Sequence, residues 1–307
     1  MTSLILVRNF AFSLVPSLLL LVHLPAIIDG FVTLVSSSHP HFHNFVPSVP
    51  WQQLTISSAL GATSNGEESW NDATVLSAEA ACSSGKSVLW KVQVEKGVNY
   101  TVPGQFLQLR KDDTTDPLFL AMCSPPNMDD TLEFLVKLTP NIPWLTDVKA
   151  DTKVQVSNVM GRGFATAAEA LQNNDKEADD GIDHMLLVAT GSGVAPIMAA
   201  FRAPGWMDRV TYGSMYYGEW TVDDLCFQDE LATEEAGINL VPCFSKQERD
   251  FTKGFWAGHV QMVMWQRGIV NPEKTLALVC GKKEMEEDVR QLLTRAGVKP
   301  ERIVTNT

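Results

Sequence analysis

A glycine-rich turn directly after an apolar run is the part of this chain best suited to hold an anion. The run Met185–Ala189 is typical of a buried strand, and the turn Thr190-Gly-Ser-Gly-Val-Ala-Pro196 follows it. Pro196 predicts that a helix begins here, because a proline in the first turn of a helix loses no hydrogen bond. A strand, a turn and a helix in this order direct backbone N–H groups and the positive helix end toward an anion, typically a nucleotide diphosphate. We predict contacts to it from Thr190, Gly191, Ser192, Gly193 and Pro196.

A hydroxyl and an ammonium group stand next to each other where a second apolar run ends. Residues 238–244 are predicted to form a strand, and Ser245 and Lys246 follow it. This pair suits a dianionic phosphate, since both groups donate hydrogen bonds to phosphate oxygens. The alternative is a solvated loop. The apolar run at 210–217 is followed by Gly218, which either lets a ligand approach closely or simply forms a turn.

A cysteine ends a third apolar run. The strand predicted at 275–280 ends in the segment Cys280-Gly281-Lys-Lys-Glu-Met285. On its own, Cys280 would be a small buried residue at a strand end. The chain has five cysteines, an odd number without zinc-like spacing, so we expect reduced thiols and no metal site.

These three segments need a sheet whose strands end at one edge. From residue 179 to residue 307, apolar strands alternate with helical patterns, which is typical of a parallel sheet flanked by helices. Ligands of such sheets bind beyond the carboxyl ends of the strands, where all three segments fall. The predicted strands are 184–189, 210–217, 238–244, 275–280 and 302–305, and the predicted helices are 222–236, 258–267 and 284–296.

The preceding part, residues 71–178, consists of shorter apolar runs separated by glycine and proline. The run that contains Val88, Trp90, Val92 and Val94 alternates with period two, which favours a small antiparallel barrel. A polar run at 172–180 predicts a solvated linker to the second domain. The predicted barrel strands are Ser87–Glu95, Gln105–Arg110, Pro117–Cys123, Leu132–Leu138 and Lys153–Val159.

The amino-terminal segment is predicted to be a targeting sequence. Residues 1–30 contain Arg8 and then an apolar run broken by prolines, which favours a signal segment over a membrane anchor. Residues 31–70 are rich in Ser, Thr and His and carry no charge before Glu67, so this region resembles the second part of the presequences that direct algal proteins to plastids. Since such segments are usually basic and this one is not, secretion is the alternative. The alternating His39, His41 and His43 are expected to belong to this presequence rather than to a metal site.

Composition limits the classes of partner. The 307 residues are 45% hydrophobic and 20% charged, which is typical of about two globular domains with appendages. The formal net charge of −12 repels phosphate backbones, so we expect no nucleic-acid partner.

The three strand ends, taken in order, resemble the ferredoxin–NADP reductase superfamily, and most closely its fruit-protein-like branch in plants and algae. The resemblance implies that the turn from Gly191 to Pro196 holds a pyridine nucleotide. Ser245 and Lys246 correspond to the Ser-Arg element that binds the 2′-phosphate of NADP, with lysine in place of arginine. Cys280-Gly281 and Met285 correspond to a Cys-Gly-x-x-x-Met motif whose thiol lies beside the reacting nicotinamide.

The resemblance is weaker in the barrel, where the family carries an Arg-x-Tyr-Ser motif for its flavin. The corresponding segment here begins Pro117-Leu118-Phe119-Leu120, so only the aromatic residue Phe119 is kept. Further along, Cys123 and Ser124 either line the flavin ring or are ordinary strand residues. The segment Gly161-Arg162-Gly163 resembles the end of a second flavin turn, in which Arg162 either supplies a phosphate-binding charge or is simply solvated.

The resemblance implies an antiparallel β-barrel flavin domain followed by an α/β parallel-sheet nucleotide-binding domain. The implied activity is that of a flavin-dependent NAD(P)H oxidoreductase with FAD and NADP (NAD is possible), in which Cys280 is the catalytic residue. The electron acceptor is unknown, and a protein acceptor is one option. Acidic ferredoxin is not expected to be the acceptor, because the chain is acidic and ends in Val304-Thr-Asn-Thr307, without the aromatic lid of ferredoxin–NADP reductases. The alternative is a non-catalytic nucleotide-binding or scaffold protein with a degenerate flavin site.

Overall fold

The computed structural model describes residues 69–126, 130–175, 177–233, 237–250 and 253–306. The predicted signal segment and nearly all of the predicted transit region, including the three histidines, lie outside these residues. Among the described residues, no helix has the length and apolar character needed to cross a membrane. The described part contains two six-stranded sheets, which belong to the same compact unit of the chain.

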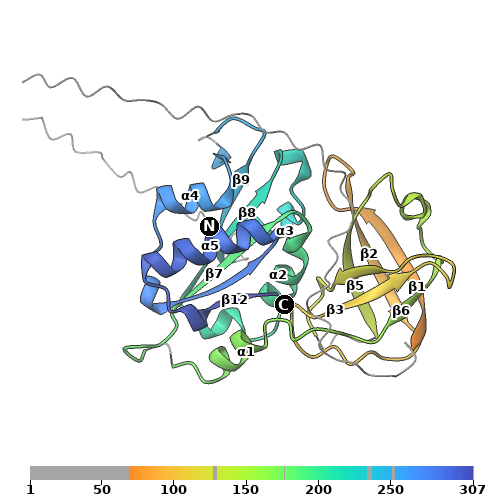
Figure 1. The fold of residues 1–307 in the computed structure, drawn as a ribbon, viewed down its shortest axis with the longest axis horizontal. Helices are drawn as coiled ribbons and strands as arrows, with labels where there is room; N and C mark the ends of the chain where they lie inside the picture. Colours follow the sequence, from red (N-terminus) through yellow and green to blue (C-terminus); the bar gives the residue numbers. More distant parts are fainter. Residues whose placement is uncertain (1–68, 127–129, 176, 234–236, 251–252, 307) are drawn as a thin grey trace, which may run out of the picture. The chain divides into compact units, whose positions relative to one another are not determined.

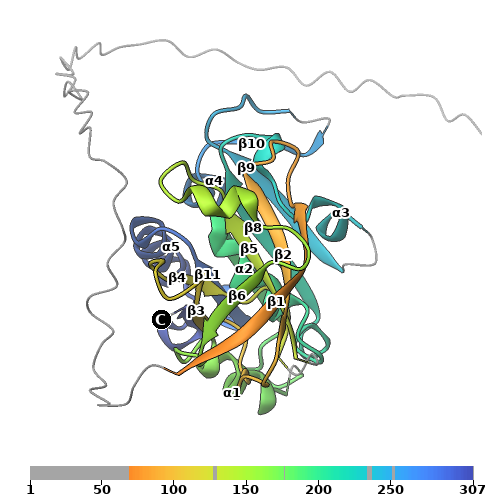
Figure 2. The same cartoon turned by 90° about the vertical axis from the view of Figure 1, so that its right-hand side faces the viewer.

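The first sheet is antiparallel and nearly closes into a barrel (Figure 2). Its strand order is β4-β3-β6-β1-β2-β5, and an isolated bridge from Met122 to Phe134 connects the ends of the series. The side chains of Trp90, Val92 and Val94 fill the interior, as their period-two alternation predicts. The strands are β1 Trp70–Ala80, β2 Ser87–Val94, β3 Phe106–Arg110, β4 Leu118–Ala121, β5 Thr131–Lys137 and β6 Lys153–Ser157.

Strand β1 is an addition to the strands that the sequence predicts. Its pairing with β2 shifts register between Val75 and Ser77, so a bulge interrupts the alternation that reveals the other strands. Only Ala73 and Val75 of this strand are fully buried. An eleven-residue strand with two core side chains and a bulge has too little pattern to be recognised from sequence.

The second sheet is parallel throughout, in the order β10-β9-β8-β7-β11-β12. Figure 1 labels four of its strands, β9, β8, β7 and β12. From β7 the chain builds the sheet outward through β8, β9 and β10, and it then returns to the other side of β7 to form β11. The boundary between β7 and β11 is therefore the switch point at which open sheets of this kind bind ligands. The strands are β7 His184–Thr190, β8 Tyr212–Glu219, β9 Ile238–Phe244, β10 Trp256–Ala257, β11 Thr275–Cys280 and β12 Ile303–Thr305.

Helices cover both faces of the parallel sheet, and successive residues of β7 point to opposite faces. Met185 and Leu187 pack with α2, whereas Leu186 and Val188 pack with α4 and α5. This double burial explains why β7 reads as a continuous apolar run. The helices are α1 Ala165–Gln172, α2 Val194–Phe201, α3 Gln228–Leu231, α4 Val260–Arg267 and α5 Lys283–Ala296.

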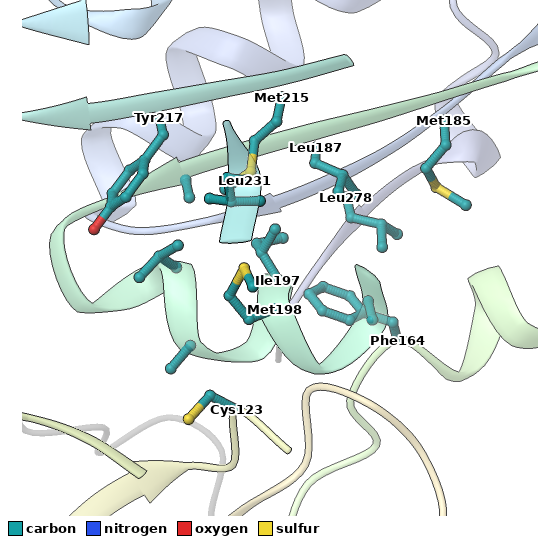
Figure 3. Close-up of a cluster of buried hydrophobic side chains, with 14 of the residues drawn as sticks. Cys123, Phe164, Met185, Leu187, Ile197, Met198, Met215, Tyr217, Leu231 and Leu278 are labelled. Carbon is teal, nitrogen blue, oxygen red and sulfur yellow. The ribbon is translucent and has the colours of Figure 1, made fainter. Parts of the chain in front are cut away.

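Helix α1 lies within the range predicted for the barrel, yet its buried side chains join the core of the parallel sheet. Ala167 and Leu171, with Phe164 just before the helix, belong to the cluster that contains β7 and α2. Figure 3 shows Phe164 beside Ile197, with Cys123 of the barrel below α2. The barrel and the sheet therefore share one apolar cluster.

The helix predicted over 222–236 is wrong for the residues described there. A short 3-10 turn (Val222–Asp224) and α3 take its place, and Phe227 between them has a left-handed φ of +57°. A tertiary bond overrides helix propensity here, because the Asp224 carboxylate accepts from Lys86 of the barrel at 2.8 Å. A local bond from the Thr221 hydroxyl to the same carboxylate, at 3.0 Å, supports the turn. Helix α2 also begins at Val194, two residues before the proline that predicts it.

Polar contacts link the barrel to the parallel-sheet domain. The Lys86 ammonium group forms an ion pair with Asp224 at 2.8 Å. The guanidinium of Arg202, just after α2, donates to the Cys123 carbonyl and the Glu133 carboxylate, both at 3.0 Å, and to Glu230 at 2.5 Å. These bonds hold the barrel against α2.

Candidate functional site

Glycines allow the turn after β7 and the turn after β11 to touch. A Cβ atom on Gly193 would overlap the carbonyl oxygen of Cys280, and one on Gly281 would overlap the hydroxyl of Thr190. Backbone atoms cannot move aside as a flexible side chain can, so Gly193 is required at its position. The two motifs therefore form one cradle at the switch point of the sheet.

The Thr190 hydroxyl is buried in this cradle and has no hydrogen-bond partner among the described residues. Leaving a buried hydroxyl unpaired costs about 1–3 kcal/mol, so its position favours a ligand that pairs with it. Gly191 has a left-handed φ of +55° and open space where a Cβ would point, and Ser192 beside it is exposed. A one-turn 3-10 helix, Gly191–Gly193, runs into α2, so its first N–H groups are free for an anion. This geometry suits a diphosphate.

Cys280 sits on the β11 side of the cradle and is partly exposed. Burial of its sulfur raises the pKa of the thiol to about 12, with the Glu286 charge adding to the rise and a hydrogen bond from Asn306 opposing it. The thiol is therefore protonated at neutral pH and is neither a nucleophile nor a base. Glu286 accepts the Gly281 N–H at 3.0 Å and so fixes the turn. Met285 is buried against the same turn.

Asn306 is a site residue that no sequence motif identifies. Its amide oxygen lies 3.1 Å from where a Cβ on Gly104 of the barrel would stand, and its side chain bonds to Cys280. The residue thus lies between the barrel and the cradle. It follows the short strand β12, where a single polar residue carries no recognisable pattern.

The ends of β8 and β9 are level with each other and lie next to the cradle. Thr190 is in register with Gly218, and Glu219 with Phe244. A Cβ on Gly218 would meet the side chains of Val260 and Thr190, at 2.8 and 3.0 Å, so close packing explains the glycine. The edge of the sheet therefore brings the three sequence motifs together.

Ser245 and Lys246 are both exposed at this edge. Their N–H groups bond to the carbonyls of Glu219 and Trp220, at 3.0 and 2.9 Å. The Lys246 ammonium lies 3.8 Å from the centroid of the Trp220 ring, which is 41% exposed. A hydroxyl and an ammonium group are thus available to a ligand at the end of β9, the strand next to β8.

On the barrel, Phe119 projects from β4 and is 54% exposed. Its ring lies 6.1 Å from that of Phe106, which in turn packs against Gly161. Arg162 is exposed beside Gly161, and a Cβ on Gly163 would overlap the carbonyl oxygen of Pro103. An exposed aromatic ring and an exposed cation are available here, and their roles at a flavin stay predictions.

Cys123 and Ser124 have a different environment, because both are fully buried. The Ser124 hydroxyl accepts the Glu133 N–H at 3.1 Å, and its carbonyl accepts from the Tyr100 hydroxyl at 2.9 Å. The Cys123 carbonyl accepts from Arg202. The bonds of Ser124 lie within the barrel, and the Cys123 carbonyl joins the barrel to the residue after α2. A role of either residue at a flavin ring stays a prediction.

Comparisons with known proteins agree with this geometry. Residues 187–291 match the oxidoreductase NAD-binding domain family, and this range includes the glycine turn, Ser245, Lys246 and Cys280. Among solved structures, a ferredoxin NADP+ reductase from Neisseria gonorrhoeae with bound FAD and NADP superposes with a TM-score of 0.61 at 19% identity, over 75% of this chain and 93% of that chain. The ferredoxin reductase in carbazole 1,9a-dioxygenase gives 0.63 at 18% identity, over 80% and 70%. The fold of this chain, an antiparallel barrel followed by a parallel sheet, is therefore that of these reductases.

Two proteins are similar to this chain in sequence over part of their length. The fruit protein pKIWI502 of Actinidia deliciosa is 24% identical over 218 residues, which are 67% of this chain and 66% of that protein. The propane 2-monooxygenase reductase component of Mycolicibacterium goodii is 25% identical over 173 residues, or 55% of this chain and 47% of that protein. The chain thus spans less than two thirds of the length of each relative.

Proposed function

We propose that this protein is a flavin-dependent NAD(P)H oxidoreductase. The observation that carries the proposal is the cradle between β7 and β11, where Gly193 and Gly281 admit close contact and the Thr190 hydroxyl has no hydrogen-bond partner in the described part of the chain. In this proposal the nucleotide diphosphate lies on the turn Gly191–Gly193, at the start of α2. Ser245 and Lys246 bind the 2′-phosphate, which makes NADPH the preferred nucleotide and NADH a possible one.

The barrel residues meet the needs of FAD in part. Phe119 offers an exposed ring for stacking, and Arg162 offers a charge for the FAD diphosphate. When both cofactors are bound, they supply the hydride transfer between nicotinamide and flavin. The task of the chain is to orient them and to exclude water.

Cys280 acts in this proposal through contact rather than through proton transfer. A protonated thiol with a pKa near 12 is a small, weakly polar group that packs against a nicotinamide ring without adding charge. Glu286 and Asn306 keep its position by bonding to the Gly281 N–H and to the thiol. Hydride transfer needs no general base, so the absence of a thiolate is no obstacle.

A non-catalytic nucleotide-binding protein is the second candidate, and the barrel favours it. Pro117 and Leu120 stand where the family carries the arginine and serine of its flavin motif. Cys123 and Ser124 are occupied in the interior, so they do not replace those groups on the surface. The cradle would then bind a nucleotide without a flavin beside it.

The electron acceptor is proposed only as a class. Two of the matched proteins are named as reductases of oxygenase systems, which favours a redox protein as the acceptor. Acidic ferredoxin is not proposed, because the net charge of −12 would repel it. We also propose delivery to a plastid through residues 1–70, which a fluorescent fusion of that segment would test against secretion.

An absorption spectrum of the purified protein, recorded before and after anaerobic addition of NADPH, decides between the two candidates. Flavin bands that bleach with NADPH are the expected result. A colourless protein that cannot be loaded with FAD but still binds NADPH would establish the non-catalytic candidate.

A further inference from the structure

Three lysines from separate segments gather around one exposed indole ring. The ammonium nitrogens of Lys246, Lys137 and Lys86 lie 3.8, 5.3 and 5.6 Å from the centroid of Trp220. Lys86 and Lys137 belong to the barrel, whereas Trp220 and Lys246 follow β8 and β9. All four side chains are exposed. In a chain with a net charge of −12, such a gathering of positive charge requires an explanation.

The carboxylates near the cluster do not cancel its charge. Asp224 pairs with Lys86 at 2.8 Å, and the Glu219 carboxyl faces Lys137. Burial raises the pKa of Glu219, although Lys137 opposes that rise. Glu219 is therefore more easily protonated than the other carboxylate, Asp224. Among the described residues, neither Lys137 nor Lys246 has a carboxylate within ion-pair distance. Three cations thus face two carboxylates, and like charges repel unless an anion joins them.

Backbone and side-chain bonds hold the cluster together. The Lys246 N–H donates to the Trp220 carbonyl at 2.9 Å, and the Gln247 side chain accepts the Val222 N–H at 2.9 Å. The Ser84 N–H donates to the carbonyl of Asp223 at 2.8 Å, which fixes the barrel loop that carries Lys86. The four segments are therefore positioned before any ligand arrives, which lowers the entropic cost of binding.

We propose that Lys86 and Lys137 of the barrel complete, with Lys246 and Trp220, the binding site for the 2′-phosphate of NADPH. The inference rests on the proposed function, because the cluster lies at the end of β8, beside the cradle at the end of β7. The 2′-phosphate is attached to the same ribose that carries the diphosphate, so a dinucleotide on the cradle places it nearby. A dianionic phosphate matches three ammonium groups, and the indole offers a surface for the adjoining sugar or base. The barrel then contributes directly to the choice between NADPH and NADH.

Lys137→Gln is the sharpest test, because among the described residues this lysine forms no ion pair, whereas Lys86 is paired with Asp224. Its exposed contact with the Trp220 ring is lost in the variant, so thermal unfolding of the variant without ligand should accompany the titrations. Calorimetric titration of the full-length protein with NADPH, NADH and 2′,5′-ADP is expected to show binding weakened about tenfold for NADPH and 2′,5′-ADP and unchanged for NADH. Lys137→Arg should restore most of the affinity, since it keeps the charge. Lys149→Gln, which removes an exposed lysine elsewhere on the barrel, is the matched control and should change nothing.

The outcomes separate this inference from the proposed function. If the wild-type protein binds NADPH more tightly than NADH and Lys137→Gln leaves that ratio intact, the barrel lysines play no part and the inference fails alone. An equal loss for NADPH and NADH would also overturn it, because the effect would not concern the 2′-phosphate. If the wild-type protein binds none of the three ligands, the proposed function and the inference fail together.

Discussion

The carboxyl edge of the parallel sheet and the outer face of the barrel differ in how they would bind a cofactor. At the sheet edge, backbone groups and glycines form the site, and no described residue forms a hydrogen bond with the Thr190 hydroxyl. On the barrel, the aromatic ring of Phe119 is exposed, but Cys123 and Ser124 point their polar atoms into the interior. The sheet edge thus has a geometry that suits a nucleotide, whereas the barrel offers only part of what the proposed flavin would need.

Gly193→Ala should have the largest effect and would test whether the sheet edge depends on backbone contact. Gly193 has a helical φ of −61°, so alanine would normally stabilise the start of α2 by up to about 1 kcal/mol. Overlap with the Cys280 carbonyl reverses that sign, and we expect a loss of about 1–3 kcal/mol in the free energy of unfolding, together with loss of nucleotide binding. Urea unfolding and calorimetry measure the two effects.

Gly85→Ala is the control for Gly193→Ala. It lies in the turn between β1 and β2, with open space around the new methyl group but a left-handed φ of +67°. It should cost about 1 kcal/mol through backbone strain and leave nucleotide binding unchanged. A stable Gly193→Ala protein that binds NADPH normally would contradict the cradle.

Lys246→Ala tests the selectivity of the same edge. Loss of a charged hydrogen bond to the 2′-phosphate should weaken NADPH binding by about 1.5–3 kcal/mol and leave NADH nearly unaffected. Lys253→Ala, another exposed lysine of the same domain, provides the comparison. Equal weakening of the two nucleotides would rule out the assignment of Lys246 to the 2′-phosphate.

Alkaline pH should weaken both regions through their buried thiols. Burial raises the pKa of Cys123 in the barrel and of Cys226, Cys243 and Cys280 in the sheet domain to about 12. In the unfolded chain these thiols ionise near pH 8.5, so the unfolded state loses protons first. Their contribution to stability is therefore complete below about pH 8.5 and is lost as the pH rises toward 12. At pH 10 the free energy of unfolding should be lower than at pH 7 by about 2 kcal/mol for each of these thiols.

Replacing one thiol isolates this effect. Cys243→Ala creates a small cavity and lowers stability at every pH, but it should reduce the loss between pH 7 and pH 10 by about 2 kcal/mol. Urea unfolding of the variant and the wild-type protein at both pH values measures the difference. Equal losses in the two proteins would show that the Cys243 thiol does not stay protonated on folding.

The sequence predicts the sheet edge better than the barrel for a physical reason. Strands buried on both faces give unbroken apolar runs, and a backbone cradle requires glycines. The strands β7, β9 and β11 and the turns that follow β7 and β11 can therefore be recognised from their residue types. Strand β1 carries a bulge, and the segment after Thr221 is shaped by bonds to Lys86 and Tyr217, so local pattern misleads there. Asn306, Glu286 and the lysines around Trp220 come together only through tertiary contacts, which no spacing along the chain encodes.

Thr190→Val separates folding from binding at the cradle. Valine has nearly the shape of threonine and removes the unpaired hydroxyl, so the free protein should become more stable by about 1 kcal/mol. Nucleotide affinity should move in the opposite direction, because the ligand loses a hydrogen-bond partner. Thermal unfolding without ligand should show increased stability, and calorimetry with NADPH should show decreased affinity. A fall in both quantities would mean that the hydroxyl already has a partner within the protein.

Phe119→Ala should have the smallest effect on folding, and it tests the proposed flavin site on the barrel. The ring is 54% exposed, so its removal should cost well under 1 kcal/mol of stability, mainly from the contact with Phe106. If the ring stacks on a flavin, FAD affinity should fall by about 0.5–1.5 kcal/mol, and Phe119→Tyr should restore it. Leu76→Ala, which trims an exposed apolar side chain of β1, is the matched control. An FAD affinity that is unchanged in Phe119→Ala would mean that the barrel holds its flavin elsewhere. The likeness of this segment to the family motif would then reflect only the fold.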